Sequence, residues 1–278
     1  MSERKSILCP NCRKLISADE PSCPYCGLLR PGLHNTAGII RNIIFAFHPV
    51  MTIIYVNIAF YILSFVLDPR GILSGGGLFT FLSPSSESLF LLGATGTIPV
   101  FEFHRFWSLI SASFLHGGIL HITFNMMALY QLGPFVLREF GLHRFVNIYV
   151  ITGIIGFAVS VFFGVSFTIG ASASICGLIG AIIYYGKSRG GSYGEAIYKQ
   201  ALGWVVGLII FGFIFRGINN WAHGGGLLSG ILLAFLMGYN DQKQETAWNK
   251  ILAYACILIS AGVLIWSAVS SLIYLIAH

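Results

Sequence analysis

The sequence predicts an all-α polytopic membrane protein, and three observations carry this prediction. Of its 278 residues, 56% are hydrophobic and only 9% are charged, whereas a soluble domain carries about 25% charged residues. The charges gather at the N-terminus and in short segments, which leaves long apolar runs between them. The net charge of +6 comes from Lys and Arg that flank those runs. It therefore indicates membrane topology, and no nucleic-acid partner is expected.

Seven apolar runs are predicted to span the lipid bilayer. They cover approximately residues 44–66, 113–134, 146–164, 172–186, 199–215, 220–239 and 251–276. A spanning helix needs about 20 residues, so the fourth and fifth runs are short. The first run follows a polar segment that contains cysteines, and we expect it to remain as an anchor instead of being cleaved as a signal peptide.

Basic residues alternate between the two sides of these runs. They precede the first run and follow the second, fourth and sixth, as at Arg138, Lys187 and Lys243. Loops rich in Lys and Arg stay in the cytoplasm. We therefore expect a multi-pass protein of a bacterial cytoplasmic membrane, with the N-terminus in the cytoplasm and the C-terminus outside.

Two Cys-x-x-Cys pairs stand near the N-terminus, and they comprise Cys9, Cys12, Cys23 and Cys26. Four thiolates at this spacing can hold Zn²⁺ tetrahedrally. The alternatives are two disulfides or a redox-active Cys-x-x-Cys pair. A cytoplasmic location disfavours disulfides. The lack of a βαβ pattern disfavours a redox-active pair. The sequence predicts a small zinc ribbon at 1–30 with a possible cytoplasmic protein partner, followed by a linker at 31–43.

Ser172 opens the fourth run, and His223 lies near the start of the sixth. Each has an ordinary explanation alone, because a serine can bond its own helix and a histidine can pack between helices. The two runs point the same way, however, so both side chains are expected at similar depth in one leaflet. Small residues would let the runs touch; they are Ala173, Gly177 and Ala181 on one run and Gly226 and Gly230 on the other. This arrangement predicts a nucleophile and its base.

The second run adds His121 and Asn125, which are four residues apart and share one helical face. His116 lies off that face. There is no His-Glu-x-x-His motif, and no carboxylate lies inside a predicted span between Phe106 and Tyr239. These absences from the sequence argue against a metalloprotease, an aspartyl-type intramembrane protease and a proton-coupled transporter.

The chain resembles the rhomboid intramembrane serine proteases over approximately residues 50–240. The resemblance rests on Phe114-Leu115-His116, His121-Ile122-Thr123-Phe124-Asn125, Gly170-Ala171-Ser172 with Gly177-Leu178-Ile179-Gly180, and Trp221-Ala222-His223 with Gly225-Gly226. It implies a six-helix rhomboid-like core at 44–240, with a loop and a seventh helix at 241–278.

The resemblance also implies the chemistry. Ser172 would be the nucleophile and His223 the base, in a dyad without a carboxylate. His121, Asn125 and the backbone N–H of Ser172 would form the oxyanion hole. Catalysis would need no cofactor, and the partners would be transmembrane protein substrates, cut near the outer leaflet, and the lipid bilayer. The aromatic-rich fifth run, with Trp204, Phe211, Phe213 and Phe215, would be a lateral gate.

Four positions depart from the family pattern. Ala173 replaces a glycine, and Cys176 replaces an aromatic residue that packs on the catalytic histidine. Arg105 precedes Trp107, where the family often has Trp-Arg. Ser174 offers a second hydroxyl, but it points about 200° away from Ser172 and is not expected to be the nucleophile. An inactive rhomboid-like binder of membrane proteins and a membrane-anchored zinc-ribbon adaptor remain as alternatives.

Overall fold

The computed structural model of the chain describes residues 6–9, 14–25, 27, 31, 48–69, 82–214 and 217–277. It divides into two compact units, Met1–Thr52 and Ile53–His278. In the first unit, β1 (Ser6–Leu8) pairs antiparallel with β2 (Leu15–Ser17). Cys9 and Cys23 are buried in one cluster beside this hairpin. Cys12, Cys26 and nearly all of the linker lie outside the described residues, and within the described ranges no group of three or more His, Cys, Asp or Glu side chains could hold a metal ion.

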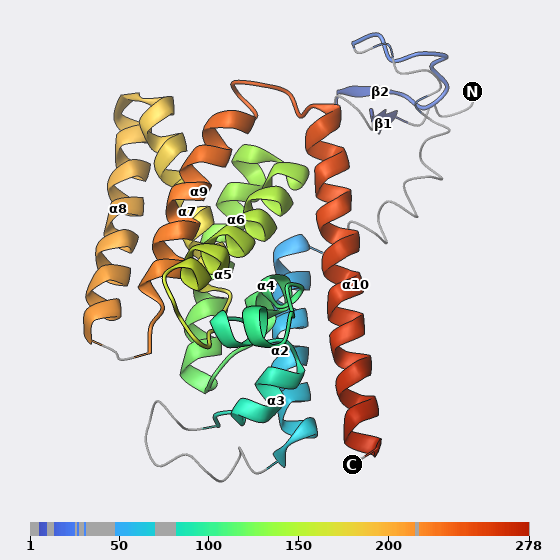
Figure 1. Cartoon of the computed structure of the whole chain (residues 1–278). Helices are drawn as coiled ribbons and strands as arrows, with labels where there is room; N and C mark the ends of the chain where they lie inside the picture. The colour runs from blue at the N-terminus through green and yellow to red at the C-terminus, as the bar shows by residue number, and fades with distance from the viewer. Residues whose placement is uncertain are drawn as a thin grey trace. The chain divides into compact units, whose positions relative to one another are not determined.

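Helices make up most of the remaining chain (Figure 1). They are α2 (Pro49–Leu67), α3 (Ser86–Leu91), α4 (Ser108–Ser111), α5 (Ile119–Phe140), α6 (Leu142–Phe162), α7 (Ser172–Arg189), α8 (Gly191–Ile214), α9 (Asn220–Met237) and α10 (Ala247–Ala277), with short turns η2 (Ile98–Glu102) and η3 (Ala112–Phe114). In the described part of the chain, six helices are long and apolar enough to cross a membrane: α2, α5, α6, α8, α9 and α10. The prediction of a helical polytopic membrane protein is confirmed for the described part of the chain.

The fourth predicted span, α7, does not meet the same apolar criterion. Its 18 residues include Lys187 and Arg189 in the last turn and a buried serine, Ser174. The physical reason lies in its surroundings, because α7 packs against α5, α6, α8 and α9 and most of its side chains are buried. A helix that faces protein instead of lipid does not need a continuous apolar surface.

Several predicted boundaries are wrong by four residues or more, and two of the helix starts have an evident cause. The second span was expected from 113, but α5 begins at Ile119, because the preceding residues form α4, η3 and an extended break around Leu115. The fifth span was expected from 199, but α8 begins at Gly191. Gly190 and Gly191 both have positive φ, at 66° and 64°. This left-handed pair reverses the chain at once, so the polar residues that follow already belong to α8.

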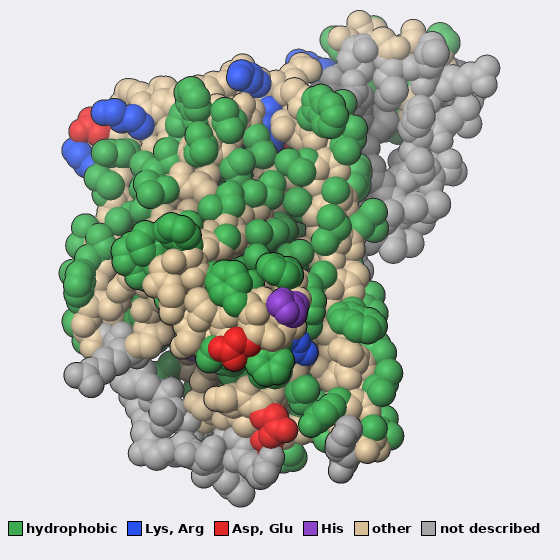
Figure 2. Space-filling view, in the orientation of Figure 1, with side chains coloured by type: hydrophobic (Ala, Val, Ile, Leu, Met, Phe, Trp, Pro, Cys, Tyr) green, Lys and Arg blue, Asp and Glu red, His purple; other side chains and the backbone are tan. Residues whose placement is uncertain are grey.

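The outer faces of the helices are apolar. Phe213 of α8 is 84% exposed and Ile276 of α10 is 85% exposed. Figure 2 shows hydrophobic side chains over the sides of the helical unit and Lys and Arg side chains concentrated near one end. Lys187 and Arg189 lie in the last turn of α7, close to the turn into α8. An apolar belt with basic residues at one end is what a bilayer-spanning protein requires.

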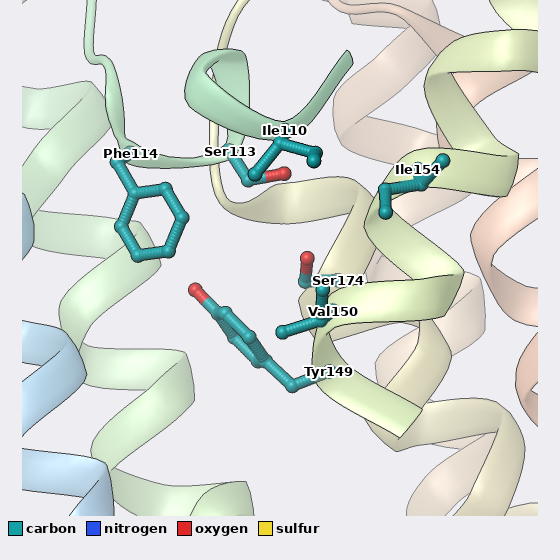
Figure 3. A pocket seen from close by; sticks show the side chains of 7 residues that line it. All are labelled: Ile110, Ser113, Phe114, Tyr149, Val150, Ile154 and Ser174. Carbon is teal, nitrogen blue, oxygen red and sulfur yellow. The ribbon is translucent and has the colours of Figure 1, made fainter. Parts of the chain in front are cut away.

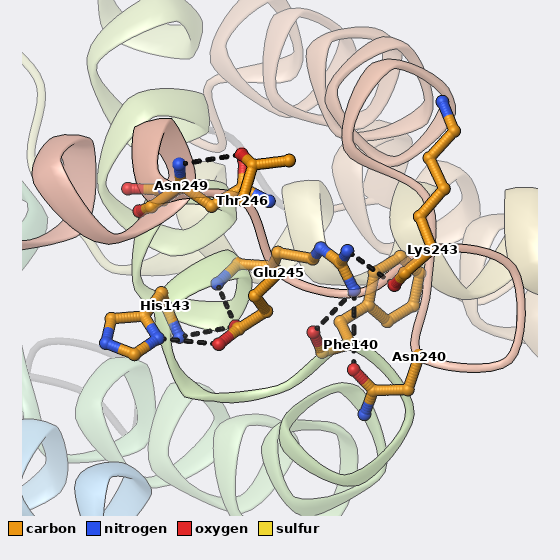
Figure 4. Close-up of polar contacts among 9 residues, drawn as sticks. Phe140, His143, Asn240, Lys243, Glu245, Thr246 and Asn249 are labelled. Atoms are coloured by element: carbon orange, nitrogen blue, oxygen red, sulfur yellow. Dashed lines mark hydrogen bonds and ion pairs between the residues drawn. The ribbon is translucent and has the colours of Figure 1, made fainter.

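A cluster of polar contacts joins the loop before the final helix, α10, to the start of α6 (Figure 4). Arg144, fully buried at the start of α6, donates from Nη2 to the carbonyl of Lys243 at 2.7 Å and from Nη1 to Asn240 Oδ1 at 3.3 Å. Glu245 Oε2 lies 2.7 Å from His143 Nδ1. Further along α10, the Ser267 hydroxyl donates to the carbonyl of Leu92 at 2.6 Å. The seventh predicted helix is therefore hydrogen-bonded to the core both through the loop before it and from within its own length.

Candidate active site

The entrance to α7 places Ser172 beside His121. The segment between α6 and α7 reaches the helix through Gly170, whose φ is +129°. A Cβ on Gly170 would stand 2.8 Å from His121 Nε2 and 3.5 Å from Ser172 Oγ. The first of these distances is too short for any side chain. Glycine at this position therefore allows the His121 ring to approach the first turn of α7.

Ser172 and His223 meet at the starts of two neighbouring helices. Ser172 is the first residue of α7, and His223 lies in the first turn of α9. The Ser172 Oγ and the His223 Nε2 are 2.8 Å apart. Both residues are partly exposed. This distance is within the range for a serine whose proton can pass to an adjacent histidine.

Small residues bring α7 and α9 into backbone contact. A Cβ on Gly226 would overlap the carbonyl oxygen of Ala173, and one on Gly230 would overlap that of Gly177. Gly180 meets the carbonyl of Leu227 in the same way. Ala173 and Gly177 of one predicted row, and Gly226 and Gly230 of the other, therefore lie at the contact between the helices that carry Ser172 and His223.

We expect Gly226→Val to lower the free energy of unfolding by about 3 kcal/mol, because the new side chain would push α9 away from Ala173. Gly224→Val is the matched control, since it makes the same change two residues away where a Cβ meets nothing within 4 Å. Thermal unfolding in detergent micelles measures both. Equal midpoints for the two variants would contradict close packing at Gly226.

His121 is oriented by a backbone hydrogen bond. Its Nδ1 accepts from the N–H of Gly117 at 3.2 Å. A neutral imidazole that accepts at Nδ1 carries its proton on Nε2. Because Nε2 faces Gly170 and the Ser172 side of the site, His121 presents a hydrogen-bond donor there. The buried His116 ring packs edge-on against it, with ring centroids 5.0 Å apart.

Asn125 lies one helical turn after His121. It is 7% exposed, and its Nδ2 donates to the carbonyl of His121 at 2.8 Å. This bond holds the amide against α5. A carboxamide has a second N–H on the same nitrogen, which can turn toward a ligand beside His121. The structure thus places His121 beside Ser172, with Asn125 next to it on the same face of α5.

Ser174 is separated from this site. It is fully buried and lines a cavity of about 10 Å³ between α6, α7 and the segment before α5 (Figure 3). The cavity is otherwise lined by Ile110, Ser113, Phe114, Tyr149, Val150 and Ile154. In the described part of the chain its hydroxyl has no hydrogen-bond partner. A serine in this position has neither the base nor the access that a nucleophile needs.

One residue beside the first turn of α9 was not singled out by the sequence patterns. Within the described ranges the Nδ1 of His223 is buried and has no hydrogen-bond partner. Cys176, at the position of the family's aromatic residue, is 1% exposed. Asn219 is the residue that sequence reasoning missed. It immediately precedes α9 and caps it, and an Asn just before a helical run is the signal that would have identified it.

Arg105 occupies the loop before α5. Its guanidinium carbon lies 4.4 Å from the Phe90 ring centroid and 4.9 Å from that of Trp107. Its Nη1 also donates to the carbonyl of Phe90 at 2.5 Å. Burial lowers the pKa of Arg105 from its usual value. The reversed order of Arg and Trp therefore still packs a cation between aromatic rings, and this contact joins the loop to Phe90 of α3.

Residues 104–240 match the family model described as the rhomboid domain. The chain is 32% identical over 212 residues to Rhomboid protease GluP of Bacillus subtilis. The aligned residues make up 76% of this chain and 39% of that protein. The chain is also 34% identical over 180 residues to RHOMBOID-like protein 6, mitochondrial, of Arabidopsis thaliana. That alignment covers 61% of this chain and 55% of the relative. The chain thus spans about half or less of the length of these two relatives. The matched domain and these relatives together support a relationship of this chain to the rhomboid family.

Proposed function

We propose that this protein is an intramembrane serine endopeptidase that cleaves transmembrane protein substrates through a Ser172–His223 dyad. The observation that carries the proposal is the distance of 2.8 Å between Ser172 Oγ and His223 Nε2 at the starts of α7 and α9. The rhomboid domain match and the relationship to a rhomboid protease favour this chemistry.

The reaction is an acyl transfer in two steps. His223 Nε2 accepts the hydroxyl proton as Ser172 Oγ attacks the peptide carbonyl, and then gives that proton to the leaving amine. A water molecule next attacks the acyl-enzyme ester, with His223 again accepting the proton. The ester bond to Ser172 breaks as His223 gives this proton to Ser172 Oγ, and the new carboxyl end of the substrate is released. Both steps use protein side chains and water alone, so they need no cofactor.

Three donors are proposed for the oxyanion. They are the His121 Nε2–H, the amide of Asn125 and the backbone N–H of Ser172. Ala171, the residue before α7, provides no side-chain hydrogen bond to cap the helix. The first N–H groups of α7 are therefore left for a ligand, at the positive end of the helix dipole. A donor of this kind contributes about 3–4 kcal/mol to transition-state stabilisation.

Substrates are proposed to enter between α5 and α8. Apart from its contact with α7, α8 is largely exposed along its length. Phe124 of α5 and Phe211 of α8 pack edge-on, with ring centroids 5.8 Å apart, and this ring pair joins the two helices. A transmembrane segment that displaces this pair reaches Ser172 from the lipid side.

Cleavage of a transmembrane substrate in proteoliposomes tests the proposal. The wild-type protein should cut the substrate within its membrane segment near the outer leaflet. Binding of the substrate without any cut would instead favour the inactive rhomboid-like binder. If no cleavage occurs in liposomes, the same reaction in detergent shows whether the substrate failed to reach the site or the site failed to cleave it.

We propose the N-terminus in the cytoplasm and the C-terminus outside. Lys187 and Arg189 at the end of α7 and Lys243 in the loop before α10 supply the cytoplasmic charge. Green fluorescent protein should therefore fluoresce when fused to the N-terminus, and alkaline phosphatase should be active only when fused to the C-terminus. Fluorescence from a C-terminal fusion would contradict the seven-span topology.

We also propose that Cys9, Cys12, Cys23 and Cys26 bind one Zn²⁺ in a domain that engages a cytoplasmic protein. Two features support the site: Cys9 and Cys23 are buried in one cluster, and the N–H of Gly27 donates to the carbonyl of Cys23 at 2.9 Å in a tight turn. Metal analysis should give one zinc per chain, and none after Cys9→Ser with Cys23→Ser.

Proteolysis should persist in that double variant, because the dyad lies in the separate helical unit. A variant that stays folded, lacks zinc and has lost cleavage would show that the N-terminal segment is not an independent accessory. Zinc retained in the double variant would remove the four-cysteine site.

A further inference from the structure

Asn219 holds the first turn of α9, the turn that carries His223, the base of the proposed dyad. Its Oδ1 accepts from the N–H of Ala222 at 3.0 Å and thereby caps α9. Its backbone carbonyl accepts from the N–H of His223 at 3.1 Å. The first turn of α9, which carries the imidazole, is thus held by one residue at two points.

The same side chain reaches outside α9. Its Nδ2 donates to the Ser160 hydroxyl at 2.5 Å and to the Thr168 hydroxyl at 2.9 Å. Ser160 lies near the end of α6, and Thr168 lies in the connection to α7, four residues before Ser172. One carboxamide therefore links the helix of the base to the segment that leads into the nucleophile.

Further hydrogen bonds extend this link to the loop before α5. Thr168 exchanges two backbone hydrogen bonds with Thr95, at 2.7 and 3.1 Å. The hydroxyl of Thr95 accepts from that of Ser108 at 2.9 Å. Ser160, Thr95 and Ser108 are fully buried, and Thr168 is 7% exposed. Polar groups in a buried network of this kind hold one arrangement, because breaking any bond leaves an unsatisfied group away from water.

A catalytic histidine is commonly oriented by a carboxylate or by an aromatic ring that packs on it, and the described residues provide neither for His223. Among the described residues no carboxylate bonds its buried Nδ1, and Cys176 provides no aromatic surface. What does restrain this turn is Asn219 together with Trp221, whose ring stacks on Phe163 at 3.7 Å between centroids. Asn219 bonds both α9 and the segment that precedes Ser172.

We propose that Asn219 is a positioning residue that sets the separation between His223 Nε2 and Ser172 Oγ. The inference rests on the proposed protease function. Asn219 touches neither the substrate nor the reacting atoms. It acts through Thr168 on one side and through the first turn of α9 on the other, and a displaced base lowers the rate of proton transfer while substrate binding is unchanged.

Asn219→Ser provides the test, because serine also caps a helix well but is too short to reach Ser160 and Thr168. We expect kcat per active site to fall by about 10- to 100-fold with KM within about twofold of wild type. The rate of Ser172 labelling by a fluorophosphonate should fall by a similar factor. Ser160→Ala combined with Thr168→Val removes the partners and should give the same pattern with Asn219 intact.

Asn147→Ser is the matched structural control. Asn147 is fully buried at the other end of α6 and donates from Nδ2 to the carbonyl of Asn249 at 2.9 Å. Its loss should lower the unfolding temperature but leave kcat per titrated active site unchanged. The same result for Asn219→Ser would overturn the positioning role and show a purely structural one. An inactive wild-type protein would instead refute the proposed function itself.

Discussion

Ser172→Ala and His223→Ala are each expected to lower kcat by at least about 10⁴-fold, and the double variant should be no worse than either single one. The physical reason is that the hydroxyl and the imidazole act as a unit: without His223 the hydroxyl keeps its proton, and without Ser172 the base has nothing to activate. Cleavage of a transmembrane substrate in proteoliposomes measures the three rates.

Ser174→Ala is the matched control for this series. It removes a hydroxyl from the same turn of α7, but one that faces the small buried cavity instead of His223. Its kcat should stay close to that of the wild type. Activity that survives Ser172→Ala but not Ser174→Ala would show that the nucleophile is assigned wrongly. Activity that survives in both variants would end the serine-protease interpretation.

His121→Ala and Asn125→Ala should each lower kcat by about 10²- to 10³-fold, which is less than loss of the dyad because the other oxyanion donors remain. KM should change little, since these donors act on charge that develops only in the transition state. Initial rates over a range of substrate concentration separate the two constants.

Asn147→Ala controls for the loss of a buried amide, because Asn147 lies far along α6 from Ser160 and the site. A rise in KM with unchanged kcat in Asn125→Ala would assign Asn125 to substrate binding instead of the oxyanion hole. Wild-type rates in His121→Ala would remove its Nε2–H from the list of donors.

Much of the membrane unit could be predicted from composition and spacing. Long apolar runs identify helices because the bilayer demands them. The rows containing Gly226 and Gly230 indicated close helix contact, and both residues do meet backbone of α7. Ser172 and His223 could be placed at one depth because the two helices run in the same direction. The structure brings their side chains to 2.8 Å.

Other features could not be predicted, because they depend on contacts between distant segments. The break at Leu115 lies between apolar residues on both sides, so hydrophobicity alone does not locate it, although Gly117 and Gly118 follow closely. The early start of α8 is set by the left-handed Gly190 and Gly191, whereas its first residues look like a loop. The links from Asn219 to Ser160 and Thr168 span 59 and 51 residues of sequence. The hydrogen bond from Arg144 to the carbonyl of Lys243 spans 99. Helical periodicity carries no information about such pairs.

Intact-mass spectrometry after reaction with a fluorophosphonate tests the Ser172–His223 dyad most directly. One adduct per chain is predicted, with fragmentation assigning it to Ser172, and the His223→Ala variant should not react on the same timescale. Because the probe needs an activated hydroxyl but no transmembrane substrate, the result does not depend on the choice of substrate. An adduct on Ser174, or equal labelling of Ser172 with and without His223, would contradict the dyad.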